Sequence, residues 1–310
     1  MMPTRWLSAA PLFIALLSVI RLPEALGQTH QITQSQTITL GIVSETNRSI
    51  VAEHFTDFIR YVAANFTSVP KVEGKVLVAP TTFELAKLFD EKKVDFYMDS
   101  PYPTYVLNEV YDVARLLLRR WKGGVAEYRS LIFTRTMGGI RSLQELRGKI
   151  IMFEYPESTS GYFLPRAFLT QKGFFLADRT RYDPYASPSD VGYRFAYSQR
   201  KLLDAVLTGQ AAAGAFSDAD YSSLDPKKKA ELTILAETES LPRHLVSVRK
   251  YFPPNLQNQL KKILLSMHEN EQGRKVLKNT DDTTKFDLLP GGEVEIHRRM
   301  AEIFHPGPRK

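Results

Sequence analysis

The feature that most constrains the fold is an alternation of short apolar strands with amphipathic helices, which runs through the chain twice. The first series begins with a strand at residues 37–43, followed by apolar residues at helical spacing over 50–62. The second begins with a strand at 149–153, after a turn at Gly138-Gly139. Further strands are predicted at residues 75–79, 94–98, 113–118, 128–134, 211–216 and 232–236. Strands that alternate with helices favour parallel pairing, so the sequence predicts an α/β protein of two lobes, each a sheet flanked by helices.

The two series also set the predicted boundaries of the lobes. The first lobe is expected to span residues 37–134 and the second 135–236, with a helical stretch over 255–277 after them. The chain has 310 residues, which is enough for two lobes of about 100–200 residues each. Open α/β sheets bind ligands in the crevice beside the carboxyl ends of their strands. We therefore expect the functional site between the lobes.

The first 27 residues have the layout of a secretory signal peptide. Arg5 gives a positive start, an apolar run covers residues 7–20, and Ala25-Leu26-Gly27 places small residues before a cut ahead of Gln28. The apolar run is short and interrupted for a membrane span, and an uncleaved N-terminal anchor is the alternative interpretation. We expect an exported, periplasmic chain whose mature form starts with a flexible segment at residues 28–36.

Composition narrows the class of partner. The chain has no cysteine, so it forms no disulfide and has no thiol near residue 27 to carry a lipid, which excludes a lipoprotein. The formal net charge is +7, but the basic residues are scattered. The densest run, Lys227-Lys228-Lys229, follows Asp225-Pro226 and is predicted to be a solvated turn. Export argues against a nucleic-acid partner, and the positive charge favours an anionic small ligand.

The strongest local signal is the turn Ser158-Thr159-Ser160-Gly161, which follows the strand at 149–153. Pro165 is tolerated in the first turn of a helix, which predicts a helix start at Gly161 or Tyr162. Three hydroxyls and the free N–H groups of the helix start would then face one point, where the helix dipole adds positive potential. These residues are predicted to bind an oxyanion. Plain helix capping, which needs only one such residue, is the alternative.

Enzyme chemistry is poorly supported by the sequence. A nucleophile elbow needs Gly-x-Ser-x-Gly, and here Ser158 stands where the first glycine would be relative to Ser160. The six histidines are scattered, none has metal-ligand spacing, and no phosphate loop or dinucleotide motif is present. We predict no catalytic residue, no metal and no cofactor. A serine hydrolase that uses Ser160 is the weaker alternative.

Two other turns are predicted to face the crevice. One follows a predicted strand and the other precedes a predicted helix. Ser100 and Tyr102, after the strand at 94–98, are predicted to approach the ligand from the first lobe together with Thr82. Gln199 and Arg200, before a helix that ends at Gly209, are predicted to form a third wall, since arginine is a strong partner for anions. An ordinary proline-containing turn and a solvated helix start are the alternatives.

Together these residues resemble the phosphate/phosphite/phosphonate-binding periplasmic proteins of ABC importers, a PhnD-like family. The resemblance covers roughly residues 37–280 and is carried by several segments. These are Thr39-Leu40-Gly41-Ile42-Val43, Val94-Asp95, Ser100-Pro101-Tyr102-Pro103-Thr104-Tyr105, Ser142-Leu143, Leu146-Arg147-Gly148-Lys149, Ser158-Thr159-Ser160-Gly161-Tyr162 and Pro165.

The resemblance implies a type II periplasmic-binding-protein fold with crossed hinge strands, at residues 128–134 and near 232–248. It also implies that residues 237–310 return to the first lobe. In that family the turn at Ser158–Gly161 binds phosphonate oxygens between two closing lobes. The implied partner is a membrane permease, and the chain is expected to be a monomer. A subunit that senses the ligand for a membrane signalling receptor is the alternative role.

The chain departs from the family pattern at three places. Ser198-Gln199-Arg200 stands where the family commonly has Ser-His-Asp, and Ala212 stands where it often has Asp. Ser100 also stands where the family often has Gly. Because the missing groups help to bind the amine of a ligand, the resemblance predicts a ligand other than an aminoalkylphosphonate.

Overall fold

The computed structural model describes residues 36–45, 47–67, 71–179 and 187–305. The predicted signal peptide, its cleavage site and nearly all of the segment at 28–36 lie outside these residues. Within them, no helix is both long enough and apolar enough to span a bilayer.

The first sheet has six strands in the order β14-β4-β13-β3-β1-β2. Its members are β1 (Gln36–Val43), β2 (Val72–Ala79), β3 (Phe96–Asp99), β4 (Ala114–Lys122), β13 (His244–Arg249) and β14 (Thr283–Asp287). The strand β1 pairs in parallel with β2 and β3, as the alternating pattern predicts. The strands that arrive from the C-terminal part of the chain, β13 and β14, pair antiparallel with their neighbours. These two strands do not enter the sheet through a strand–helix–strand crossover. The alternation of strands and helices therefore did not predict their antiparallel pairing.

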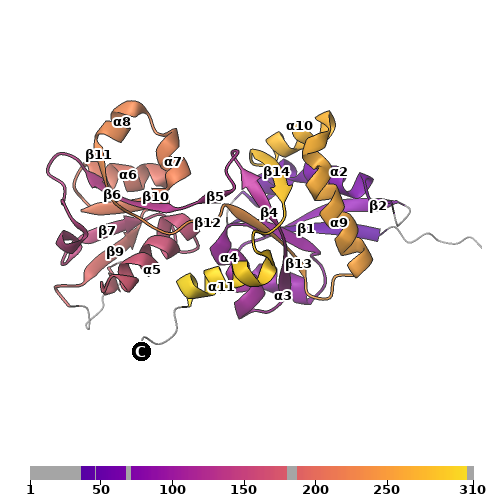
Figure 1. Cartoon of the computed structure of the whole chain (residues 1–310), viewed down its shortest axis with the longest axis horizontal. Coiled ribbons are helices and arrows are strands. Elements are labelled where there is room, and N and C mark those ends of the chain that lie inside the picture. Colours follow the sequence, from indigo (N-terminus) through magenta and orange to yellow (C-terminus); the bar gives the residue numbers. More distant parts are fainter. Residues whose placement is uncertain (1–35, 46, 68–70, 180–186, 306–310) are drawn as a thin grey trace, which may run out of the picture. The chain divides into compact units, whose positions relative to one another are not determined.

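Helices cover both faces of the first sheet (Figure 1). One face carries α1 (Arg48–His54), α2 (Thr56–Ala64), α9 (Pro254–Ser266) and α10 (Glu271–Asn279), and the other carries α3 (Thr82–Asp90) and α4 (Pro101–Tyr105). Phe58 of α2 and Leu264 of α9 belong to the same buried core cluster as Leu40 of β1. Leu85 of α3 packs with Tyr97 in a second cluster. The helix predicted over 50–62 is interrupted at Phe55, which lies between α1 and α2.

The second sheet also has six strands, in the order β11-β6-β10-β7-β9-β8. Its members are β6 (Ser130–Arg135), β7 (Ile150–Phe153), β8 (Leu176–Asp178), β9 (Val191–Phe195), β10 (Ala213–Ser217) and β11 (Leu232–Glu237). Its faces pack against α5 (Leu164–Gln171) on one side and α6 (Gln199–Leu207) on the other. The lysine run at 227–229 forms a short helix, α8 (Pro226–Ala230), rather than a turn. β9 is not among the predicted strands, because prolines and serines next to it hide the alternation of Val191, Tyr193 and Phe195.

Two chain crossings join the sheets. They pair with each other as a short ladder of β5 (Glu127–Tyr128) and β12 (Leu241–Pro242). We call the first sheet with its helices the first lobe, and the second sheet with its helices the second lobe. The boundary predicted after residue 134 falls inside β6, which pairs entirely within the second sheet. The crossings therefore lie at residues 123–129 and 238–243, inside or just before the predicted hinge segments.

The C-terminal helix α11 (Gly292–Phe304) contacts both lobes. It packs on the first lobe through Ile296 and Met300, and Ile303 is buried with Leu164 and Leu241. Its Arg299 reaches both crossings, donating to the Ser240 carbonyl at 2.7 Å and to Glu127 at 3.4 Å.

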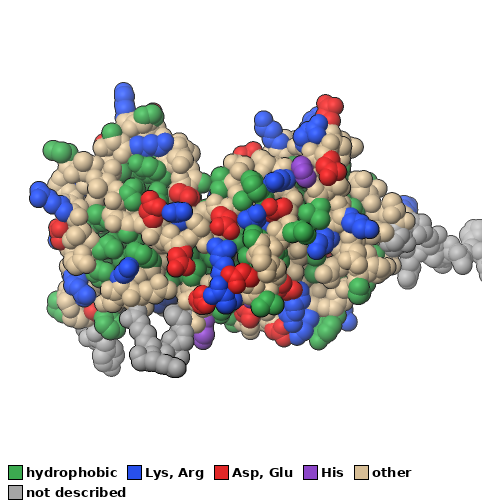
Figure 2. Space-filling model, viewed as in Figure 1, with side chains coloured by type: hydrophobic (Ala, Val, Ile, Leu, Met, Phe, Trp, Pro, Cys, Tyr) green, Lys and Arg blue, Asp and Glu red, His purple; other side chains and the backbone are tan. Residues whose placement is uncertain are grey.

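The outer side of α11 is highly charged. Arg298 pairs with Glu295 and Glu302 at 2.7 and 2.6 Å. Blue and red side chains lie side by side over this region in Figure 2. Ile296, Met300 and Ile303 are therefore turned to the lobes and Arg298 to solvent, as expected of an amphipathic helix at a surface.

Candidate ligand-binding site

The turn after β7 opens directly into a helix, and Ser158 caps it. A wide π-helical turn at Thr159–Phe163 continues into α5. The Ser158 hydroxyl accepts the Gly161 N–H at 3.0 Å and donates to Glu154 Oε2 at 3.1 Å. The helix thus begins at Thr159, two or three residues before the start predicted at Gly161 or Tyr162. Proline is tolerated further inside because the Gly161 carbonyl, four residues before it, accepts the Glu154 N–H at 3.1 Å instead.

The three hydroxyls of this turn have three different situations. Ser158 is the cap, as the capping interpretation predicts. Thr159 Oγ1 accepts the Tyr102 N–H of the first lobe at 2.9 Å. Ser160 is only 8% exposed, yet its hydroxyl has no hydrogen-bond partner among the described residues. In particular, no histidine of the described chain bonds to it, as a serine hydrolase would require. Gly161 is needed for packing, because a Cβ there would lie 2.7 Å from both Glu154 Oε2 and Ser158 Oγ.

Ser158, Thr159 and Ser160 line an open cavity of about 530 Å³ that receives side chains from both lobes and from the crossings. Its lining includes seven charged side chains. The cations are Arg120, Lys122 and Arg243, and the carboxylates are Asp99, Glu154, Asp220 and Asp281. The site therefore combines a helix start with charged groups of both signs.

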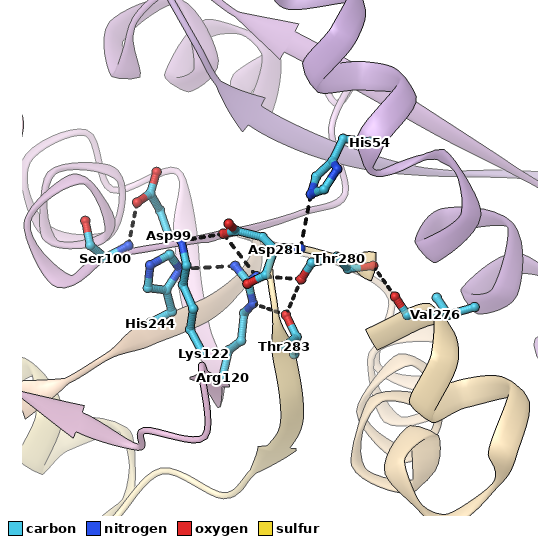
Figure 3. Close-up of polar contacts among 10 residues, drawn as sticks. All are labelled: His54, Asp99, Ser100, Arg120, Lys122, His244, Val276, Thr280, Asp281 and Thr283. Atoms are coloured by element: carbon cyan, nitrogen blue, oxygen red, sulfur yellow. Dashed lines mark hydrogen bonds and ion pairs between the residues drawn. The ribbon is translucent and has the colours of Figure 1, made fainter. Parts of the chain in front are cut away.

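The first lobe contributes a wall that we call the Arg120 cluster: Arg120, Lys122, His244, Asp281 and Thr283 (Figure 3). Arg120 on β4 is 1% exposed, and its Nε donates to Thr283 Oγ1 at 2.7 Å. Its Nη2 lies 3.3 Å from Asp281 Oδ2, and Lys122 Nζ lies 2.6 Å from the same oxygen. Its Nη1 lies 3.2 Å from His244 Nδ1. A buried guanidinium requires such partners, because an unpaired one costs several kcal/mol.

Electrostatics fix the charge states of this wall. Burial lowers the pKa of His244 well below its usual value, and the charge of Arg120 lowers it further, so the imidazole is neutral. Because arginine can only donate, Nδ1 accepts and the ring proton sits on Nε2. Burial alone would raise the pKa of Asp281, but Lys122 and Arg120 bring it below the ordinary value, so this carboxylate stays ionised.

The opposite side of the cavity is acidic. Burial raises the pKa of Glu154, the hydrogen bond from Ser158 opposes this, and the neighbouring charge of Asp220 adds to it. Asp220 is held by Ser217, whose hydroxyl donates to it at 2.6 Å in a capping box. From the second crossing, Arg243 lies over the Tyr128 ring at 4.5 Å. Burial raises the pKa of Tyr128 to about 12, so its phenol is a neutral donor.

Of the other predicted site residues, Ser100 lines the cavity, whereas Tyr102, Thr82, Gln199 and Arg200 lie outside its lining. The ring of Tyr102 stacks on Phe163 with centroids 3.2 Å apart. The Thr82 hydroxyl donates to Glu157 Oε2 at 3.1 Å, which is a contact between the lobes. Gln199 and Arg200 begin α6 outside the cavity lining, and the Arg200 side chain is 88% exposed beside Asp204. The described residues contain no group of three or more histidines and carboxylates placed to hold a metal ion.

Two α/β lobes joined by paired crossings, with a polar cavity where they meet, define a bilobal solute-binding protein. Over residues 40–289 the sequence matches the family described as "ABC transporter, phosphonate, periplasmic substrate-binding protein", and the chain belongs to that family. The family predicted from the sequence is thereby confirmed.

Solved structures agree with this assignment. XAC2383 from Xanthomonas citri, solved bound to ATP, is 26% identical over 87% of this chain and 96% of its own, with a TM-score of 0.77. PhnD1 from Prochlorococcus marinus, in complex with methylphosphonate, is 16% identical over 86% and 97%, with a TM-score of 0.61. A sulfonate-binding SsuA protein from Methylobacillus flagellatus is 13% identical over 88% of each chain, with a TM-score of 0.54. The type II periplasmic-binding-protein fold is confirmed.

Proposed function

We propose that this chain binds a solute bearing a phosphorus oxyanion in the cavity between its lobes and delivers it to a membrane permease. One observation carries the proposal: the helix that starts at Thr159 opens on the cavity, and Ser160 brings to it a hydroxyl that has no hydrogen-bond partner among the described residues. The first N–H groups of a helix have no acceptor within it, and its dipole favours an anion there. The family description and the ATP bound to the 26%-identical Xanthomonas citri protein support a phosphorus-containing ligand.

Lobe closure is part of this proposal. The lobes already contact each other through the Tyr102 N–H to Thr159 and through Thr82 to Glu157. Rotation about the paired crossings β5 and β12 would tighten or release both contacts while leaving each sheet intact. Each charge-assisted hydrogen bond to the ligand contributes about 1.5–3 kcal/mol. A few such bonds suffice for micromolar affinity after the cost of closure.

Phosphonates that carry an amine belong in the tested set. The prediction against them depends on the absence of His and Asp at positions 199, 200 and 212. None of these positions is in a described contact with the Ser158–Ser160 turn, and none lines the cavity, whereas four carboxylates from other positions do. A ligand ammonium therefore has partners here that the family motif does not contain.

A thermal-shift screen with phosphate, phosphite, sulfate, methylphosphonate and 2-aminoethylphosphonate tests the proposal. A ligand at 100 times its dissociation constant should add about 2.7 kcal/mol of stability. The double change Ser158→Ala with Ser160→Ala should remove the shift, while Ser266→Ala, a serine at the end of α9 outside the cavity, should keep it. A panel without any shift from a phosphorus oxyanion would refute the ligand class. A shift that survives the double change would remove the turn from the site.

A further inference from the structure

The cavity is larger than a simple oxyanion needs. Its volume is about 530 Å³. Methylphosphonate has five heavy atoms, and at roughly 30 Å³ each, the share of one water molecule, it fills well under half of that space. If the oxyanion sits at the helix start in the second lobe, the wall formed by the first lobe is left to contact the rest of the ligand.

In that wall two cations share one carboxylate oxygen. Arg120 and Lys122 both contact Asp281 Oδ2, and Asp99 is a second anion that acts on Arg120. Asp99 also lines the cavity, but its two oxygens accept the Tyr97 hydroxyl and the Ser100 N–H. The Lys122 side chain remains 28% exposed, in contrast to the fully buried Arg120. Lys122 is therefore the cation of this wall that a ligand can reach.

The loop that supplies Asp281 adopts an unusual backbone conformation. Asp281 and Asp282 both have positive φ, 55° and 50°, which non-glycine residues seldom adopt. The Asp281 N–H donates to His54 Nε2 at 3.1 Å, and Asp282 O accepts the Gly123 N–H at 2.8 Å. Contacts on both sides thus hold the carboxylate beside Lys122 and Arg120 at the cavity surface.

We propose that the Arg120 cluster is a second subsite, in which Lys122 binds a second acidic group of the ligand while the turn at Ser158–Ser160 binds the phosphorus oxyanion. This inference rests on the proposed function and specifies its substrate class: a phosphonate or phosphate ester that also carries a carboxylate or another phosphoryl group. Without that group, the Asp281 carboxylate pairs with Lys122. His244 adds a neutral N–H donor beside Lys122. Arg120 acts as a positioning residue, because its donors are directed at protein acceptors.

The test compares ligands matched in size that differ by one acidic group. Calorimetric titrations would use phosphonocarboxylates with one to three methylene groups, and alkylphosphonates of equal chain length. At least one diacid should bind about tenfold to hundredfold more tightly than its alkyl counterpart, the range expected for one charged hydrogen bond. Lys122→Met should lower the affinity for the diacid more than that for the alkylphosphonate, and so abolish that advantage.

Lys285→Met is the matched control, because Lys285 lies over the Trp121 ring at 4.1 Å outside the cavity lining. It should keep the diacid preference. Equal affinities of diacids and alkylphosphonates for the unaltered protein would overturn the second subsite and leave the proposed function standing. A Lys122→Met variant that weakens both ligand series alike would also overturn the subsite. Absence of binding by every phosphonate would refute the proposed function itself, and the subsite with it.

Discussion

The two walls of the cavity solve the same problem, the placement of polar groups out of solvent, in opposite ways. The turn wall of the second lobe uses neutral hydroxyls and the N–H groups of a helix start, all supplied by consecutive residues. The Arg120 cluster brings together charged side chains from β4 and from the loop before β14, with the neutral His244 of β13 beside them. Neutral groups in a local turn need few partners, whereas a buried cation must be compensated at every donor. The turn wall should therefore tolerate substitution far better than the cluster.

Arg120→Met is the most severe test of that difference. It leaves the Asp281 carboxylate without one of its two cations and the Thr283 hydroxyl without its donor. Removal of one partner of a buried ion pair costs about 3–5 kcal/mol, and we expect a loss of that size in the free energy of unfolding by urea denaturation. Arg298→Met, at an exposed position on α11, should leave the denaturation midpoint unchanged. If Arg120→Met had an effect as small as that of Arg298→Met, the cluster would tolerate substitution as well as the turn does.

His244 should give the cluster a pH dependence that the turn lacks. Its folded-state pKa is depressed by burial and by Arg120, so the unfolded chain binds the extra proton first as pH falls below about 6.5. Stability should then drop by about 1.4 kcal/mol per pH unit from roughly pH 6.5 downward, until the folded histidine also protonates. His244→Gln should flatten this slope between about pH 7.5 and 5, and His305→Gln, at the surface, should keep it. Parallel slopes for the two variants would contradict the assignment.

Within the turn, Ser158 and Ser160 should separate stability from binding. Ser158→Ala removes the helix cap, which costs about 1 kcal/mol in the free energy of unfolding. Ser160→Ala removes a hydroxyl without a protein partner in the described structure, so it should lower ligand affinity and leave unfolding almost unchanged. Denaturation and calorimetry on both variants would check this, and a stability loss confined to Ser160→Ala would reverse the two roles.

The smallest effect is expected at the predicted third wall. Arg200 is exposed and pairs loosely with Asp204 at 3.8 Å. Arg200→Ala should change stability by less than about 0.5 kcal/mol, as surface substitutions do, and should not alter ligand affinity. A large loss of affinity in a titration would restore Arg200 to the site and imply a more closed conformation that brings α6 to the ligand.

The sequence identified the turn wall because consecutive residues stay together whatever the lobes do. It could not assign a separate role to each hydroxyl, since those roles depend on the local conformation that brings Glu154 to Ser158 and on Tyr102, which the fold brings near from the first lobe. The Arg120 cluster had no local signature, because its members lie far apart along the chain. One signal was available: Arg119 and Arg120 interrupt a strand whose other positions are largely buried, and an arginine in such a place needs a specific reason.

For the fold too, features that depend on neighbouring residues were predictable, and features that depend on distant ones were not. Parallel units were predictable because strand and helix periodicities alternate within about 30 residues. The antiparallel strands β13 and β14 join the first sheet from distant parts of the chain, and no local pattern specifies such partners. Gln199 and Arg200 had suitable residue types at a helix start, but α6 does not bring them into the cavity lining.

If the lobes close as proposed, the helix α11 would adjust affinity from outside the binding site. Phe304, at its end, lies near the rings of both Tyr102 and Phe163, which belong to different lobes. In the proposed closure, the contacts of Phe304 with both lobes would help to set the fraction of molecules that are competent to bind. The apparent dissociation constant scales inversely with that fraction. A substitution that makes the competent state about tenfold rarer would weaken binding about tenfold for every ligand alike. Overall affinity and ligand preference can therefore change independently, the first through α11 and the second through the walls of the cavity.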